Sequence, residues 1–189
     1  MGTENKVNKY KICIFGKRKS VCNLRWAIYQ DLIDVVDECC YLGINLHRKG
    51  NLNKSVKILN ERALKAFKQL LSVCSRLNLD IKTKLSLFDA LVAPIIIYGS
   101  EIWGAYDIQE VDKLDYQFCK IVLGVRPQTS NAAVLGELGR VPLSVIARHR
   151  AVKYWIRVLQ NPGSLIHAVY NKQRDFFNSS TATQNTKQF

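Results

Sequence analysis

The feature that most constrains the fold of this 189-residue chain is a change in hydrophobic period near Asn51. Before Asn51, the β-prone runs "YKICIF" (10–15) and "VVDECCYLGINL" (35–46) are typical of short strands. After it, apolar residues recur every three or four positions, the period of an amphipathic helix: Val56, Leu59, Ala63, Phe67, Leu70, Cys74 and Leu77. The change predicts an α+β fold, in which a small antiparallel strand region precedes a helical bundle.

Capping and stop signals predict where the later helices begin and end. Asp80 can cap a helix that starts near Ile81, and Pro94 must bend or end it. Its buried side would carry Leu85, Phe88, Leu91, Val92 and Ile95. Asp107 and Glu110 form a capping box for the next helix, which Gly124 would stop. That helix would point Val111, Leu114, Phe118, Ile121 and Val122 inward.

The remaining signals complete the predicted organisation. Further helices are expected after Thr129 or Ser130, from Pro142 to about Gln160, and after Ser164. The chain then divides into a strand region (1–51), a first helical region (52–125), a helical extension (126–176) and a polar tail (177–189) that we expect to be disordered.

The charge of the chain indicates a polyanionic partner. It has 28 Lys and Arg against 15 Asp and Glu, a net charge of +13. Residues 1–30 and 53–84 are the basic blocks, and the predicted helix after Asn51 exposes Lys54, Lys57, Glu61, Lys65 and Lys68 opposite its apolar face. Residues 85–118 are acidic, so we expect them to face away from a nucleic acid.

Patterns of several enzyme classes are absent. The chain has no G-x-S-x-G, no HExxH and no Gly-rich phosphate loop. Asp37 and Glu38 adjoin in a predicted strand, where successive side chains point to opposite faces and cannot share an ion. Asp112 and Asp115 share a helix face, which we interpret as solvated. The sequence therefore predicts no small-molecule cofactor and no metal site within this chain.

Cysteine and hydropathy patterns bear on compartment. The six cysteines form no C-x-x-C pair, which favours buried thiols over zinc ligands. The apolar run at 87–104 is interrupted by Asp89 and Pro94 and is shorter than the roughly 20 residues of a membrane span. We therefore expect no membrane association and an intracellular location, in the cytoplasm or nucleus.

Four segments in one order point to a particular family. "NKYKICIF" (8–15), "YLGINL" (41–46), "LFDALVAPIIIYGSEIWG" (87–104) and "GELGRVPL" (136–143) together resemble the C-terminal part of reverse transcriptases from LINE-type non-LTR retrotransposons. The resemblance covers about residues 6–160. It implies a polymerase seen from the end of its palm onward, with the helices after Asn53 as its thumb.

The resemblance also implies which residues bind nucleic acid. "NKYKICIF" would be motif D, in which Tyr10 replaces the family's usual Thr. Lys9 would match the lysine that in related polymerases helps protonate the leaving pyrophosphate, and Lys9 and Lys11 are both predicted to contact the nucleic acid. "CYLGINL" would be motif E, the primer-grip hairpin, with Tyr41, Leu42 and Gly43 against the backbone of the nucleic acid. Lys54, Lys57, Lys65 and Lys68 would lie along an RNA or RNA/DNA template–primer duplex.

The family's catalytic aspartates lie on motifs upstream of motif D, and this chain does not supply them. We therefore predict a reverse-transcriptase fragment that retains template–primer contacts and does not polymerise alone, and we expect Mg²⁺ only in a complete polymerase. Two alternatives remain open. One is a stand-alone basic helical module that binds RNA or a protein partner, and the other is a non-functional truncated retroelement product.

Overall fold

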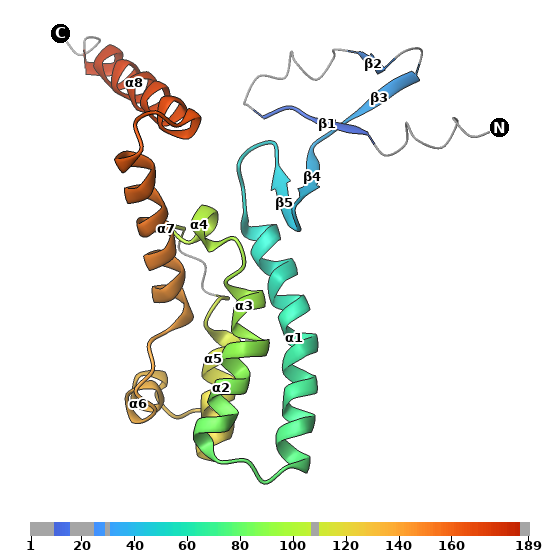
Figure 1. The fold of residues 1–189 in the computed structure, drawn as a ribbon, viewed down its shortest axis with the longest axis vertical. Coiled ribbons are helices and arrows are strands. Elements are labelled where there is room, and N and C mark those ends of the chain that lie inside the picture. Colours follow the sequence, from blue (N-terminus) through green and yellow to red (C-terminus); the bar gives the residue numbers. More distant parts are fainter. Residues whose placement is uncertain (1–9, 16–24, 29–30, 107–109, 186–189) are drawn as a thin grey trace. The chain divides into compact units, whose positions relative to one another are not determined.

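The computed structural model describes residues 10–15, 25–28, 31–106 and 110–185 (Figure 1). The chain forms two compact units, the first of residues 1–99 and 107–144, and the second of residues 100–106 and 145–189. This division differs from the predicted one, because residues 126–144 belong to the same unit as the preceding helices. The predicted fold class is confirmed, since short strands precede a run of helices.

The strands form a three-stranded sheet and a separate hairpin. The sheet has the order β1 (Lys11–Cys13), β3 (Asp31–Val36), β2 (Trp26–Ile28). β2, a strand that the sequence did not predict, pairs antiparallel with β3. β1 pairs parallel with β3, whereas an antiparallel strand region was expected. A parallel pair is joined by a long connection rather than a tight turn, so no local turn signal announces it.

The hairpin joins β4 (Glu38–Tyr41) to β5 (Ile44–His47) through a two-residue turn. Both turn residues have positive φ, 47° at Leu42 and 80° at Gly43. Two such residues in sequence are the requirement of a type I′ turn, whose twist matches that of the flanking strands. Leu42 is the one non-glycine residue with positive φ in the described part of the chain, and it adopts this conformation at a cost of about 1 kcal/mol or more.

The long helix α1 (Asn53–Arg76) follows the hairpin and has the predicted apolar face. Its buried residues are Ser55, Val56, Leu59, Ala63, Phe67 and Leu70. The prediction fails only at the end of the helix: Leu77 is 53% exposed, because α1 ends at Arg76 and Leu77 is already extended. The four lysines predicted for the opposite face are all exposed.

The second and third helices match their capping and stop signals. The Asp80 carboxylate accepts a hydrogen bond from the Thr83 amide at 3.2 Å and caps α2 (Ile81–Leu91). Pro94 falls in the first turn of α3 (Ala93–Ile96), so the chain breaks between α2 and α3 as predicted. Leu91, expected on the buried side, is 53% exposed, because α2 ends there.

Helices α5, α6 and α7 lie between residues 113 and 160. α5 (Lys113–Leu123) ends at Gly124, which has φ of 66° as predicted for a helix stop. α6 (Asn131–Glu137) and α7 (Leu143–Gln160) follow. Asp107 of the predicted capping box lies outside the described residues. Ile121, expected to point inward, is 48% exposed, so the buried stripe of α5 is narrower than its sequence suggested.

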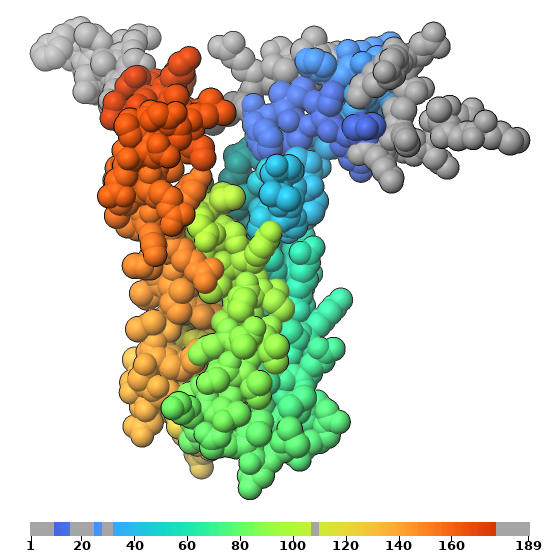
Figure 2. Space-filling view, viewed as in Figure 1, coloured from blue at the N-terminus to red at the C-terminus, as the bar shows by residue number. Residues whose placement is uncertain are grey.

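An aromatic cluster forms the core of the first unit. The rings of Phe88 and Phe118 stack with centroids 4.7 Å apart, and Phe67 meets both edge-on at 6.4 and 6.1 Å. All three rings are buried. They join α1, α2 and α5, and side chains fill the space between α1 and α2 in the space-filling view (Figure 2).

The second unit consists of α4 (Ser100–Trp103), most of α7, and α8 (Leu165–Asn185). A Cβ atom at Gly104 would lie 2.3 Å from the carbonyl oxygen of Ala147, so only glycine permits this approach of α4 to α7. Ser164 starts α8 as predicted, since its hydroxyl accepts a hydrogen bond from the His167 amide at 3.2 Å. α8 continues to Asn185, so the tail expected to be disordered from residue 177 is helical to that point, because extending a formed helix adds one hydrogen bond per residue.

The thiols and the hydropathy give two further outcomes. Of the described cysteines, Cys119 is buried, Cys40 is exposed, and Cys13, Cys39 and Cys74 are half-buried, so the prediction of uniformly buried thiols is wrong. Cys40 lies in a two-stranded hairpin that covers only part of its surface. No helix among the described residues combines the length and apolar character needed to cross a membrane.

Candidate nucleic-acid interface

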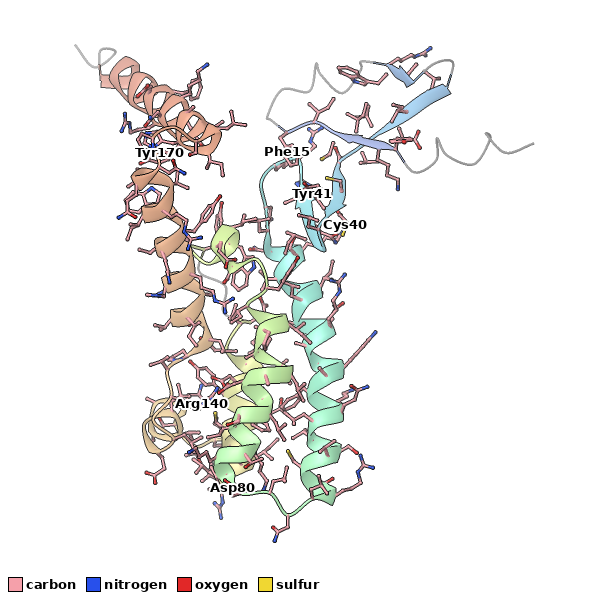
Figure 3. The ribbon with its side chains drawn as sticks, in the orientation of Figure 1. Phe15, Cys40, Tyr41, Asp80, Arg140 and Tyr170 are labelled. Atoms are coloured by element: carbon pink, nitrogen blue, oxygen red, sulfur yellow. The ribbon has the colours of Figure 1, made fainter. Side chains whose placement is uncertain are left out.

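The turn of the β4–β5 hairpin is exposed, and hydrogen bonds from side chains of the helical region fix its backbone. Tyr41 and Leu42 are 65% and 72% exposed. The hydroxyl of Tyr98 donates a hydrogen bond to the Leu42 carbonyl at 2.8 Å, and Arg62 of α1 donates to the Gly43 carbonyl at 3.5 Å. Figure 3 labels Tyr41 on this hairpin, next to Cys40. The first unit therefore presents a protruding turn whose backbone is fixed by side chains from the helices.

Two glycines shape the contact between the hairpin and the helices. Gly99 has φ of 67°, and a Cβ atom there would lie 2.9 Å from Cδ1 of Ile44, which is buried at the start of β5. At Gly43, a Cβ atom would lie 3.6 Å from the Tyr98 ring, an ordinary contact. Gly43 was predicted for close approach to a nucleic acid; the structure gives it an additional reason, the positive φ of the turn.

The helix that follows the hairpin, α1, carries lysines on its exposed face. Lys57, Lys65 and Lys68 are exposed, and in the part of the chain that the structure describes none of them is held in an ion pair. Their spacing places them on one side of the helix over about 16 Å, at 1.5 Å per residue. Lys54, by contrast, pairs with Glu38 of β4. The structure thus leaves three of the four predicted lysines available and engages the fourth in joining α1 to the hairpin.

Carboxylates lie near one end of this face. Lys57 and Glu61 line a small hollow of about 210 Å³ together with Glu110 and Lys113. The mixed charges make this end less positive than the part of α1 that carries Lys65 and Lys68. Of the two predicted motif D lysines, Lys11 is exposed in β1, in register with Asp34, and Lys9 lies outside the described residues.

A partly buried charged cluster was missed by sequence reasoning. Arg140 donates two hydrogen bonds to Asp89, at 2.7 and 3.0 Å, and a third to Asp115 at 3.1 Å. Its guanidinium lies 5.9 Å from the centroid of the Phe88 ring, within cation–π range. Figure 3 shows Arg140 beside α2 and α5. The cluster joins α2, α5 and the segment before α7.

The interpretation of Asp112 and Asp115 as a solvated face is wrong. Asp115 is fully buried. Burial raises the pKa of its carboxyl, while the neighbouring Arg140 acts in the opposite direction and leaves a net increase. Asp112 accepts hydrogen bonds from the amide and hydroxyl of Ser144, at 2.8 and 2.7 Å, instead of capping α5.

A usable signal was present for Asp115. It follows Val111 by four residues and precedes Phe118 by three, and these two residues were predicted to point inward. A charge at that position of a helix has to meet a buried partner. The partner, Arg140, is 25 residues away in the sequence, so no local signal identifies it.

The same buried environment acts on Cys119. Its thiol lies 3.7 Å from the Asp115 carboxylate. Burial first, and the Asp115 charge second, raise the pKa of Cys119 to about 12. The thiol is therefore protonated at neutral pH and is unsuited to nucleophilic chemistry. In the part of the chain that the structure describes, no group of three or more His, Cys, Asp or Glu residues could hold a metal ion.

Comparison with known proteins gives one finding, which concerns the evolutionary origin of the chain. Over 71 residues, 38% of this chain, the sequence is 34% identical to an uncharacterised transposon-derived protein of Caenorhabditis elegans. The chain spans about a quarter of that relative's length (25%). No protein-family model and no solved structure matches. The similarity indicates a transposon-related origin for this chain.

Three of the four segments contact one another within the first unit. The turn of "YLGINL" contacts Tyr98 and Gly99 of the apolar segment at 87–104. Asp89 of that same segment binds Arg140 of "GELGRVPL". Three motifs distant in sequence therefore meet in pairs within the first unit.

Proposed function

We propose that this chain is part of a retrotransposon reverse transcriptase and contributes the hairpin and helices that contact a template–primer duplex. The observation that carries the proposal is the exposed Leu42–Gly43 turn, whose carbonyls are held by Tyr98 and Arg62 at the head of the lysine-bearing helix α1. A fixed turn can press against a nucleic-acid backbone without losing conformational entropy on binding. The origin indicated by the C. elegans relative supports the same proposal.

The lysines would supply affinity through phosphate contacts. Each neutralised phosphate releases counterions, so the logarithm of the binding constant falls by about 0.9 per phosphate for each unit of log salt concentration. Contacts from Lys57, Lys65 and Lys68 would therefore contribute a slope of about 2.7. We expect little sequence preference, because phosphate contacts position a duplex without reading its bases.

The binding part of the proposal is tested by titrating an RNA/DNA hybrid against the full chain at several salt concentrations. The triple variant K57A/K65A/K68A should weaken binding and reduce the slope by about 2 to 3. The variant K82A/K153A/K172A removes equal charge from other exposed positions and is the matched control. Equal slopes for the two triple variants would contradict a role for the α1 face.

The polymerase part needs a separate experiment. The full chain would be combined with an upstream palm segment of a non-LTR reverse transcriptase that carries the catalytic aspartates, and primer extension would be measured with Mg²⁺. We expect extension only when both parts are present. If no such pair extends a primer while hybrid binding persists, the chain is a nucleic-acid-binding module and not a polymerase part.

One observation favours such a stand-alone module as the second candidate. The first unit has its own aromatic core and the partly buried Arg140 cluster, which together join helices α1, α2 and α5. A unit with this packing is expected to fold cooperatively without an upstream domain. A cooperative unfolding transition of the chain alone would support this candidate and argue against a decayed product that does not fold.

A further inference from the structure

The second unit contains a large apolar hollow that the proposed nucleic-acid contacts do not use. It has a volume of about 650 Å³ and lies between α7 and α8. Its apolar walls include Ala151, Val152, Trp155, Val158, Ile166 and Val169. A volume in this range is typical of a site that takes up a ligand or a row of side chains.

The two walls of the hollow are held together at one end. His167 of α8 donates a hydrogen bond from Nδ1 to the carbonyl of Val158 in α7, at 3.0 Å, and Ser164 caps α8. Figure 1 shows α8 following the C-terminal end of α7 at an angle, and Tyr170, which also lines the hollow, lies at this corner (Figure 3). The groove is therefore formed before any partner binds.

Apolar side chains continue from the groove along α7. Val145, Val152 and Leu159 follow one another at intervals of seven residues, and Trp155 lies between the last two on the same side. These four are between 37% and 51% exposed, and Ile166 and Val169 on the opposite wall are 51% and 56% exposed. A contiguous apolar stripe of this kind marks a docking surface rather than ordinary scattered exposure.

The spacing and the charge define the occupant. A seven-residue apolar repeat on a helix is complementary to a second helix with apolar residues at i, i+3, i+4 and i+7. The hollow itself is lined by one cation, Arg148, and one carboxylate, Glu101. The described part of this unit outside the hollow carries five further basic residues (Arg150, Lys153, Arg157, Lys172 and Arg174) against one further acidic residue (Asp175). A second copy of the chain would bring the same positive charges, whereas carboxylates would be attracted.

We propose that the α7–α8 groove docks an amphipathic helix of a partner protein, with its apolar stripe in the groove and Asp or Glu on its flanks. This function is independent of duplex binding by α1. It gives the chain two surfaces of different chemistry, one for phosphates and one for an acidic helix.

The test uses the full chain and a designed fluorescein-labelled peptide of about 18 residues, with Leu at i, i+3, i+4 and i+7, Glu on the flanks and no Trp. We expect saturable binding in fluorescence anisotropy and a blue shift of Trp emission, because the peptide would cover Trp155. The shift should be lost in Trp155→Phe. A peptide with the same Leu stripe and Lys flanks should bind at least about tenfold more weakly.

Substitutions on both walls locate the site. Val152→Lys and Val169→Lys, one on each helix, should each weaken binding at least about tenfold, since each places a charge in the groove. Ile121→Lys is the matched control, because Ile121 is 48% exposed on a helix of the first unit. K57A/K65A/K68A should leave peptide binding unchanged, which separates this inference from the proposed function.

Four results would overturn the proposal. They are equal binding of the two peptides, no binding at about 100 μM peptide, a concentration-dependent dimer that Val152→Lys abolishes, and single-stranded RNA binding that Val152→Lys weakens. The third would assign the groove to a second copy of the chain, and the fourth to nucleic acid.

Discussion

Removal of the Arg140 guanidinium should be one of the most destabilising single changes in the first unit. Arg140→Met keeps an unbranched side chain of similar length against Phe88 but leaves the buried Asp115 carboxylate without its cation. Truncating one partner of a buried ion pair costs about 3–5 kcal/mol. Asp89, in contrast, has a side chain that is 51% exposed, so Asp89→Asn should cost only about 1 kcal/mol.

The assay is urea unfolding of the full chain followed by circular dichroism, with Arg140→Met, Asp115→Asn and the double variant forming a cycle. We expect a coupling energy of about 1–3 kcal/mol between the two positions, because each side chain is the buried partner of the other. The reasoning is refuted if Arg140→Met costs no more than Asp89→Asn, or if the coupling energy is zero.

The pH dependence of the same variants provides an independent check. Burial holds the pKa of Asp115 above its ordinary value of 3.8. The folded state thus binds this proton more tightly than the unfolded chain, and the stability from this group declines as pH rises through the folded pKa. In Arg140→Met the opposing cation is gone, so the pKa should rise further and the cost of the substitution should be smaller near pH 4 than at pH 7. Adding Asp115→Asn should remove this pH dependence.

Two further tests concern glycine substitutions and the reactivity of two cysteines. Gly99→Ala should destabilise the chain by about 1–3 kcal/mol, because residue 99 has a positive φ and the new Cβ would overlap the Ile44 side chain. Gly136→Ala should stabilise the chain by about 0.5–1 kcal/mol, because Gly136 lies in open space on α6. Urea unfolding measures both changes. In the folded chain at pH 8, iodoacetamide should modify the exposed Cys40 within the time that it leaves Cys119 intact, as read by mass spectrometry of peptides, and equal labelling would contradict the protonated, buried state of Cys119.

Local signals predicted the helices well because their causes are local. The apolar period of α1, the Asp80 cap and the break at Pro94 each depend on residues within a turn or two, and each is found as predicted. The exposed lysines of α1 follow from the same period. The strand region was harder to predict, since the parallel pairing of β1 with β3 depends on a long connection with no turn signal.

The contacts that build the candidate site are long-range and were not predictable in the same way. Tyr98 and Leu42 are 56 residues apart, and Arg140 and Asp89 are 51 apart. From the local sequence, each of these residues can be interpreted as part of a turn, as a surface charge or as a residue at the edge of the core. Only the fold shows that Asp115 needs a cation and that Arg140 supplies it.

The attachment of the hairpin has a mechanical consequence. The Leu42–Gly43 turn is fixed through Tyr98 and Arg62 to the helices, and Gly99 seats Ile44 against the same segment. A tilt of α1 and α3 must therefore move the turn as well. If a nucleic acid binds at the turn, a displacement of the helices would change its contacts with the turn. Tyr98→Phe would weaken this linkage without removing a positive charge.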